Sequence, residues 1–495
     1  MNLFSGLSST QFGIGLLPEI TVAVTALVVI LADLFIERKT VLVVLSIIGL
    51  ALAAFFSIAL WGTSLGFFGG RLAVDNYALF FKILVIGIAV MVILATTDYA
   101  SKIARFRGEY YALLLTSALG MMIMAAGIEL ITIYIGLELA SISLYALTGF
   151  LKDPKSSESS LKYLLLGSIA SAVLLYGMAL VFGFTGQTTL TGIAGVVQSM
   201  SRDNLASNPA LLVGLVLMAA GFSFKIAAVP FHMWVPDVYE GAPTPITAYL
   251  SVASKAAGFA VILRVFTTAF GLPGTLSEDW GILFAVLAAV SMTLGNIVAI
   301  PQTNIKRMLG YSSIAQAGYI MVGLAAVGMS PTADTFSPGS LLFFLAGYAF
   351  TNLAAFTAII AITNKINSDL IQDFAGIGKR APMLAAVLTL SLVSLIGIPP
   401  AVGFMGKFYV FSGAVRQGLI WLVIIAVINS VISAYYYLRV VKVMWFNEPA
   451  SMEKVPSSVA LRFTLGLTGL GILFVGIMPG WLMKLAETAA HMLGF

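Results

Sequence analysis

Apolar runs of twenty or more residues recur along this chain. A helix of about 20 apolar residues spans a bilayer with every backbone group paired inside the segment. Only 9% of the residues are charged, whereas a soluble domain carries about 25%, so the chain cannot cover a surface that faces water. A transmembrane barrel needs alternating segments of about ten residues, and none recur here. The sequence therefore predicts an all-α polytopic membrane protein surrounded by the lipid bilayer.

The hydropathy pattern predicts about fourteen transmembrane helices joined by links too short to hold a soluble domain. These helices lie near residues 14–36, 41–61, 74–97, 109–127, 129–150, 161–186, 209–230, 244–268, 279–301, 306–329, 338–364, 383–413, 418–446 and 459–486. With an even number of spans, both termini lie on one side of the membrane.

Lysine and arginine are distributed unevenly between the links. The links after even-numbered helices hold three, Arg71, Arg202 and Arg416. The links after odd-numbered helices hold thirteen: Arg38, Lys39, Lys102, Arg105, Arg107, Lys152, Lys155, Lys306, Arg307, Lys365, Lys379, Arg380 and Lys454. Because positive links stay in the cytoplasm, we expect both termini outside, in a bacterial inner membrane. The net charge of +5 is thus a topology signal, and no nucleic-acid partner is expected.

Two predicted helices, the seventh and the twelfth, share an interruption. FKIAAVP (224–230) and IPPAVGFMGKF (398–408) each place a mid-membrane lysine close to proline, which breaks a helix. The two helices stand five apart, so five-helix units would have opposite orientations, as in inverted-repeat transporters. We predict N-terminal helices over 1–108, a first repeat of helices 4–8 over 109–268, a second of helices 9–13 over 279–446, and a C-terminal helix over 459–495.

Four ionisable residues are predicted to lie deep in the membrane: Glu138, Lys225, Lys255 and Lys407. Inserting each charged side chain near the bilayer centre costs roughly 2.5–3.5 kcal/mol. An interhelical ion pair that only fixes packing explains a single pair better than a row of lysines. A desolvated lysine holds its proton less tightly, and a nearby carboxylate restores the charged form. Moving Glu138 toward or away from Lys225 would therefore change whether Lys225 holds a proton, and a row of such sites would make a proton relay.

Two other ionisable residues, Lys162 and His232, each have two possible roles. Lys162 opens the predicted sixth helix, either as a further relay residue or as an interfacial lysine that reaches toward water. His232 follows Pro230 and could relay protons or cap the broken helix; the relay is favoured slightly. Glu19 is assigned a structural role near a helix end, and Lys82 lies deeper with no break beside it.

Charged residues at the predicted cytoplasmic surface have simpler roles. Lys306 and Arg307 open the tenth helix and are read as anchors, while Asp237 and Glu240 are expected to line an aqueous mouth.

Several cofactor classes are excluded on this chain. It has no cysteine and two histidines, which excludes disulfides and thiolate-held iron–sulfur clusters and leaves too few ligands for a bis-histidine haem plus a second site. A phosphate loop needs a glycine and a Ser or Thr at positions where GIPPAVGFMGKF (397–408) has Ala401 and Phe408. We therefore expect no cofactor and no metal on this chain.

Four stretches carry a resemblance to a known family. They are YIGLELASISLYALTG (134–149), KYLLLGSIASAVLLYGMAL (162–180), FKIAAVPFHMWVPDVYEGAPTPITAYLSVASKAAGF (224–259) and NIKRMLGYSSIAQAGY (304–319). The chain resembles, over nearly its whole length, the antiporter-like membrane subunits of respiratory complex I, the proton-pumping NADH:quinone oxidoreductase, and the related Mrp cation/proton antiporters. The third stretch is the most specific, because it joins both lysines of helices 7 and 8 to the break between them.

The resemblance implies a fourteen-helix fold with inverted repeats and broken helices 7 and 12. It also implies that Glu138 pairs with Lys225, that Lys255 connects onward, and that Lys407 lies toward the periplasmic exit, with Lys162 matching a further family lysine. A lysine at position 407 is typical of the N and L branches, because the M branch has glutamate there. The chain ends soon after helix 14, without the long lateral helix of the L branch, and LKYLLLGSIAS also looks like the N branch.

The resemblance further implies a proton-translocating subunit of a hetero-oligomeric membrane arm, part of a translocase that couples NADH oxidation to quinone reduction. FMN, iron–sulfur clusters and quinone would then be bound by other subunits. A rival hypothesis is an Mrp-type subunit that exchanges Na⁺ or K⁺ for protons without redox chemistry. A ferredoxin-fed relative also stays open, and the number of buried lysines argues against an inert scaffold.

Overall fold

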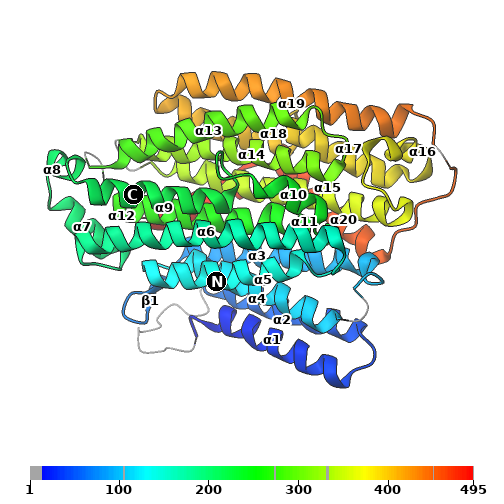
Figure 1. Cartoon of the computed structure of the whole chain (residues 1–495), viewed down its shortest axis with the longest axis horizontal. Helices are drawn as coiled ribbons and strands as arrows, with labels where there is room; N and C mark the ends of the chain where they lie inside the picture. The colour runs from blue at the N-terminus through cyan, green and yellow to red at the C-terminus, as the bar shows by residue number, and fades with distance from the viewer. Residues whose placement is uncertain (1–13, 104–105, 273–274, 331–333, 450, 494–495) are drawn as a thin grey trace.

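The computed structural model of the chain is a bundle of long helices that run roughly side by side (Figure 1). It describes residues 14–103, 106–272, 275–330, 334–449 and 451–493. Within these ranges, twelve helical segments are long and apolar enough to cross a membrane, which confirms the predicted all-α membrane fold. The predicted lead over residues 1–13 and Arg105 lie outside the described residues.

The N-terminal part of the bundle contains three long helices and one short hairpin. The helices are α1 (Leu17–Phe35), α2 (Thr40–Ala59) and α3 (Asn76–Thr96), followed by a 3₁₀ turn over Thr97–Tyr99. Between α2 and α3, strands β1 (Leu65–Phe67) and β2 (Leu72–Val74) pair antiparallel. Gly69 and Gly70 make the turn at positive φ, which glycine adopts without steric cost. The hydropathy pattern did not predict this hairpin.

The middle of the chain contains the first broken helix. Its elements are α4 (Arg107–Ala126), α5 (Leu130–Thr148), α6 (Pro154–Thr185), α7 (Leu190–Gln198), α8 (Arg202–Ala206), α9 (Pro209–Ile226), α10 (Trp234–Gly241), α11 (Thr244–Tyr249), a π-helical segment over Leu250–Ser254 and α12 (Lys255–Phe270). Helix α6 begins seven residues before the predicted start, because Asp153 caps its N-terminus and Pro154 fits the first turn. Lys162 therefore lies inside α6 and does not open it.

The C-terminal part contains the second broken helix. Its elements are α13 (Ser277–Ala299), α14 (Ile305–Gly328), α15 (Phe336–Ile366), a 3₁₀ turn over Ile371–Phe374, α16 (Ile377–Arg380), α17 (Pro382–Ile396), α18 (Val402–Arg416), α19 (Ile420–Phe446), α20 (Val459–Ile477), α21 (Gly480–Ala490) and a final turn over His491–Leu493. The predicted last helix is thus two helices, separated at Pro479. Helix α14 and the pair α17–α18 are not among the twelve segments, so the count of fourteen stays a prediction.

Both predicted breaks are present. Helix α9 ends at Ile226, where Ala227 takes a φ of 64°, and α17 ends at Ile396, where Gly397 takes a φ of 93°. Each chain segment then turns and resumes as a second short helix, α10 or α18. The pairing of these two breaks as inverted repeats, with the domain limits drawn from it, stays a prediction.

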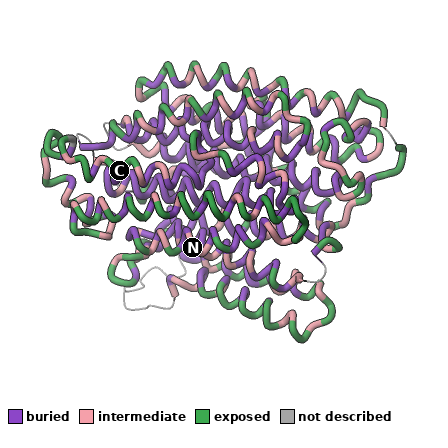
Figure 2. The backbone as a smooth tube through the Cα atoms, viewed as in Figure 1, coloured by how far each residue is buried: buried purple, intermediate pink, exposed green. Residues whose placement is uncertain are grey.

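Among the twelve candidate spans, the two most buried lie in the middle of the bundle (Figure 2). In the most apolar 18-residue stretch of each helix, the share of buried residues is 100% for the segment from α11 to α12 and 94% for α15, whereas it is 28% for α1. Lysine-bearing α12 therefore lies in protein on every side. Outer helices such as α1 and α19 present apolar side chains to the membrane.

Ion pairs at the two ends of the bundle agree with the alternating path of the helices. Links predicted on one side contact each other, through Lys155–Glu240 at 2.9 Å and Lys365–Glu453 at 2.8 Å. Links predicted on the other side also contact each other, through Arg71–Glu129 at 3.4 Å and Arg202–Glu278 at 3.2 Å. Which end faces the cytoplasm stays a prediction.

Two buried ion pairs attach α3 to its neighbours. Lys82 Nζ lies 2.6 Å from the Glu19 carboxylate on α1, and the Lys82 side chain is 0% exposed. On α12, the Arg264 guanidinium donates to both oxygens of Asp75, at 2.9 and 2.8 Å. The bidentate geometry suits a buried arginine–carboxylate pair. Glu19 has the structural role that its sequence position suggested, and Lys82 is its partner.

The Glu19–Lys82 pair generates a stability prediction. Lys82→Met leaves a carboxylate buried without a partner, which costs about 3–5 kcal/mol. Glu19→Gln combined with Lys82→Met removes both charges and should recover most of that loss. Thermal unfolding of the protein in detergent, followed by size-exclusion chromatography, measures both effects. Lys484→Met, on the exposed side of α21, is the matched control, and a single Lys82→Met variant as stable as the wild type would contradict the prediction.

Candidate functional site

Lys225 lies in the last turn of α9 and is 4% exposed. Its ammonium donates a hydrogen bond to the Ser141 hydroxyl on α5 at 2.8 Å. Glu138 lies three residues before Ser141, and residues at this spacing share a helix face. Its Oε1 is buried and has no hydrogen-bond partner among the described residues. Ser141 thus accepts the hydrogen bond of Lys225, and the pairing of Glu138 with Lys225 that the resemblance implies stays a prediction.

The break after Lys225 is held by the surrounding protein. The Trp234 indole donates to the Phe224 carbonyl at 3.0 Å, and the Val229 amide donates to the Ser291 hydroxyl at 2.9 Å. Unwound backbone at membrane depth needs such partners, because the hydrocarbon offers none. On α12, a Cβ at Gly258 would lie 2.8 Å from Cγ2 of Ile226 and 3.5 Å from Cγ of Lys225, so glycine at this position lets the end of α9 pack closely against α12.

Lys255 is the first residue of α12 and is 2% exposed. It follows the π-helical segment Leu250–Ser254, a local irregularity that often marks functional positions. Its ammonium donates to the carbonyl and the hydroxyl of Ser313 on α14. The Tyr348 ring lies 5.5 Å away, and the Tyr348 hydroxyl is 3.0 Å from the Ser313 hydroxyl. The partners of Lys255 are all neutral groups.

Helix α14 connects the Lys255 site to the Lys407 site. Gln316 lies three residues after Ser313 on the same face of α14, and its amide donates to the Leu395 carbonyl at 2.9 Å. The same carbonyl accepts a hydrogen bond from Lys407 at 3.0 Å. The two lysine sites therefore meet at one face of α14: Lys255 contacts Ser313, and Lys407 shares the Leu395 carbonyl with Gln316.

Lys407, on α18, is 4% exposed and reaches back to the end of α17. Its ammonium donates to the carbonyls of Leu395 and Ile396 and to the Ser430 hydroxyl, at 3.0, 2.9 and 2.9 Å. The Tyr319 ring lies 4.2 Å from Nζ. The last carbonyls of a helix lack intrahelical partners and carry partial negative charge, which favours a cation. A cavity of about 790 Å³ beside Lys407 and Ser430 is lined by residues of α17, α18 and α19.

Lys162 and His232 lie outside this row of contacts. The Lys162 side chain is 44% exposed and is paired with Glu158 and Asp237, each at 2.8 Å. His232 lies half-buried in the turn between α9 and α10, and its Nδ1 has no hydrogen-bond partner in the described ranges.

The charged cluster around α10 joins several links. Arg307 donates to Asp237 at 2.6 Å and to Glu240 at 3.1 Å. The sequence predicts that Lys306 anchors the tenth helix at the cytoplasmic surface, but its side chain is buried, at 5% exposed. Its ammonium lies 3.3 Å from the Asp369 carboxylate and donates to the Ala242 carbonyl at 3.2 Å. Burial and a carboxylate partner give it a packing role between the links.

Comparison with known proteins places the chain in a family. A family model described as NADH:quinone oxidoreductase/Mrp antiporter, TM, matches residues 126–433. NADH-quinone oxidoreductase subunit N of Dehalococcoides mccartyi is 50% identical over 481 residues, covering 96% of this chain and 99% of that protein. Subunit N of Trichlorobacter lovleyi is 44% identical over 485 residues, covering 97% of each. This chain belongs to the subunit N family of NADH-quinone oxidoreductases.

Solved structures agree with that assignment. A chain of respiratory complex I from Thermus thermophilus is 30% identical, with a TM-score of 0.79 over 95% of this chain and 99% of that one. A chain of the Mrp complex from Dietzia has a TM-score of 0.83 at 18% identity, over 97% of each. The second likeness shows the fold alone. Together they make the chain a multi-pass membrane protein with the fold of the subunit N family.

Several polar residues at the site of this family member were missed by the sequence analysis. They are Ser141, Ser313, Gln316, Tyr319 and Ser430. Three of them lie in the stretch 304–319, where Ser313, Gln316 and Tyr319 repeat every three residues. A polar stripe at helical spacing inside an otherwise buried helix is the signal that would have found them.

Proposed function

We propose that this chain is the proton-translocating subunit N of an NADH-quinone oxidoreductase. In this role it couples electron transfer from NADH to quinone to proton pumping, through a buried relay that includes Glu138, Lys225, Lys255 and Lys407. The observation that carries the proposal is that the Lys255 and Lys407 sites meet at one face of α14, where Ser313 accepts from Lys255 and Gln316 shares the Leu395 carbonyl with Lys407.

The partners of the buried lysines support a relay. Lys225, Lys255 and Lys407 donate to hydroxyls and carbonyls, so none of them breaks a direct contact with a carboxylate when it loses its proton. Lys82 and Lys306 instead contact carboxylates, and deprotonating either would strand a buried anion at high cost. The first three lysines are therefore suited to change protonation state, and the other two are suited to stay charged.

The remaining relay step lies between α5, α9 and α12. Glu138 and Ser141 share a face of α5, and the Lys225 ammonium contacts that face. The Lys225 stem packs on Gly258, three residues after Lys255. A small movement of α5 or α9 changes how strongly the Glu138 carboxylate favours the charged form of Lys225, because Coulomb energy falls with distance. His232 and Lys162 are proposed as the approach to this step from the predicted cytoplasmic side.

The proposal assigns the redox chemistry to other subunits. The family relatives are subunits of NADH-quinone oxidoreductase, and we propose that FMN, iron–sulfur clusters and quinone are bound by partners in a hetero-oligomeric membrane arm. Both termini would lie outside, as the distribution of Lys and Arg predicts. Co-purification of flavin and iron–sulfur subunits with this chain tests the assignment, whereas co-purification with Mrp-type subunits alone would favour the cation/proton exchange hypothesis.

Removing a relay residue should lower redox activity and pumping together. In the assembled complex, Lys225→Ala or Glu138→Ala should reduce quinone-linked NADH oxidation and acidification of inverted vesicles by roughly 100-fold, as expected for a positioned proton-transfer group. Lys484→Ala, an exposed lysine on α21, is the control. Wild-type turnover with wild-type proton stoichiometry in both variants would overturn the relay.

The Gln316 link makes a second prediction. Gln316→Leu keeps a similar volume but removes the hydrogen bond to the Leu395 carbonyl, a loss of about 1 kcal/mol or roughly fivefold in rate. Proton pumping measured by a fluorescent pH dye in inverted vesicles should fall by that factor. Gln417→Leu, at the end of α18 and away from the lysines, is the matched control. Equal pumping in both variants would show that Gln316 does not lie on the proton path.

A further inference from the structure

The step between Lys225 and Lys255 is not spanned by side-chain hydrogen bonds among the described residues. The Lys225 ammonium contacts Ser141 on α5, and the Lys255 ammonium contacts Ser313 on α14. A proton that moves between the two lysines therefore needs further groups to carry it.

Tyr163, on α6, is fixed in a cluster of aromatic rings. Its ring stacks on Trp234, with centroids 4.5 Å apart and planes 11° apart, and meets the Tyr145 ring edge-on at 4.7 Å. Trp234 is itself held, because its indole donates to the Phe224 carbonyl at 3.0 Å. The packing of these rings therefore holds the Tyr163 hydroxyl in one place inside the protein.

The Tyr145 side of this cluster reaches the Lys225 site. Tyr145, Ser141 and Lys225 line one cavity of about 10 Å³ between α5, α6 and α9, which is about the room that one water molecule needs. Gly167 on α6 leaves space for the Tyr145 hydroxyl, since a Cβ at this position would overlap that oxygen. Tyr145 therefore connects the Tyr163 ring to the surroundings of Lys225.

The hydroxyl of Tyr163 points to the other lysine site. It lies beside the hydroxyl of Ser254, the last residue of the π-helical segment that precedes Lys255. Ser251, one turn earlier, donates to the Ala248 carbonyl at 2.8 Å, which is the usual bond of a serine inside a helix. Ser254 makes no hydrogen bond of this kind among the described residues, so its hydroxyl is available to Tyr163 and to water.

Both hydroxyls are buried and unpaired. Tyr163 is 0% exposed and Ser254 is 1% exposed, and neither hydroxyl has a hydrogen-bond partner in the described part of the chain. Buried polar groups that the protein leaves unpaired are typically bridged by internal water. These two hydroxyls therefore make a polar site between the two lysines that suits ordered water and proton transfer.

We propose that the Tyr163 and Ser254 hydroxyls, bridged by buried water, carry protons between Lys225 and Lys255. The inference rests on the proposed relay and adds two residues to it. Each hydroxyl accepts a proton on its oxygen and releases its own proton onward, so both residues leave the step chemically unchanged. Lys225 ends as the neutral amine when Lys255 ends as the ammonium, and the net charge of the site is conserved.

Removing either hydroxyl from the assembled complex tests the inference. Tyr163→Phe keeps the ring stacking and removes only the hydroxyl, and Ser254→Ala removes its partner. Each should lower proton pumping in inverted vesicles and quinone-linked NADH oxidation by roughly 100-fold, as expected for a positioned proton-transfer group. The double variant should be no slower than either single variant, because both interrupt one path.

Two matched variants serve as controls. Tyr111→Phe removes another fully buried and unpaired tyrosine hydroxyl, on α4, where the nearby charge is Arg107 and not a lysine of the row. Ser251→Ala removes a buried serine hydroxyl that bonds only to its own helix. Both should pump at the wild-type rate, and co-elution of the partner subunits in size-exclusion chromatography shows that each complex is assembled.

A solvent isotope measurement separates a relay role from a packing role. Slowing a proton transfer makes that transfer rate-limiting, so the ratio of turnover in H₂O to turnover in D₂O should be larger for Tyr163→Phe than for the wild type and Tyr111→Phe. A slow Tyr163→Phe complex with the wild-type ratio would show a packing defect and contradict the inference.

Lys225→Ala and Lys255→Ala, measured in parallel, distinguish failure of this inference from failure of the relay. Impaired pumping in both lysine variants, with wild-type pumping in Tyr163→Phe and Ser254→Ala, would overturn the inference and leave the relay in place. Wild-type pumping in both lysine variants would overturn the relay and the inference together.

Discussion

The structure depends on one constraint: in hydrocarbon, every polar backbone group and every charge must find its partner within the protein. A broken helix exposes carbonyls at its C-terminal end, and a buried lysine brings an ammonium that needs acceptors. At the break between α17 and α18 these two needs satisfy each other, because Lys407 donates to the carbonyls that end α17. At the break between α9 and α10 the Trp234 indole donates to the Phe224 carbonyl, and Lys225 donates to Ser141.

The same constraint separates two kinds of buried lysine. Lys82 and Lys306 contact carboxylates and join elements that must stay together. Lys225, Lys255 and Lys407 contact hydroxyls and carbonyls, which accept a hydrogen bond from the charged form and tolerate the neutral form. All five lysines are buried, so it is the chemistry of the acceptor that separates the three proposed for the relay from the two in ion pairs.

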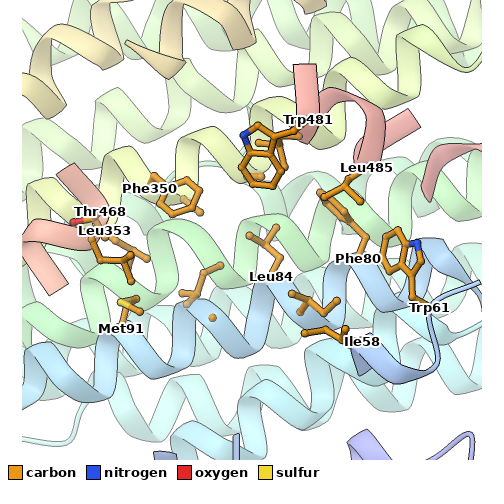
Figure 3. Close-up of a pocket in the computed structure, with 17 residues that line it drawn as sticks. Ile58, Trp61, Phe80, Leu84, Met91, Phe350, Leu353, Thr468, Trp481 and Leu485 are labelled. Atoms are coloured by element: carbon orange, nitrogen blue, oxygen red, sulfur yellow. The ribbon is translucent and has the colours of Figure 1, made fainter. Parts of the chain in front are cut away.

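Position in the bundle explains why α12 and α14 carry the polar contacts around Lys255. The segment from α11 to α12 is buried on all sides, whereas the outer helices α1 and α19 face the membrane. A polar stripe on an outer helix would face lipid and cost several kcal/mol per unsatisfied group. Apolar side chains of α2, α3, α15, α20 and α21 instead line a groove with almost no polar surface (Figure 3).

The sequence by itself determined the helical membrane fold, the breaks near Pro230 and Pro399–Pro400, and the burial of Lys225, Lys255 and Lys407, because long apolar runs and prolines act locally along the chain. It left Lys162 at the wrong place in its helix and gave no partner for Lys255 or Lys407. Only the tertiary structure decided that Ser141, Ser313 and Leu395 accept these ammonium groups and that Lys82 pairs with Glu19. The physical reason is that a hydrogen bond joins residues 12 to 84 positions apart in sequence, and their meeting depends on how whole helices pack.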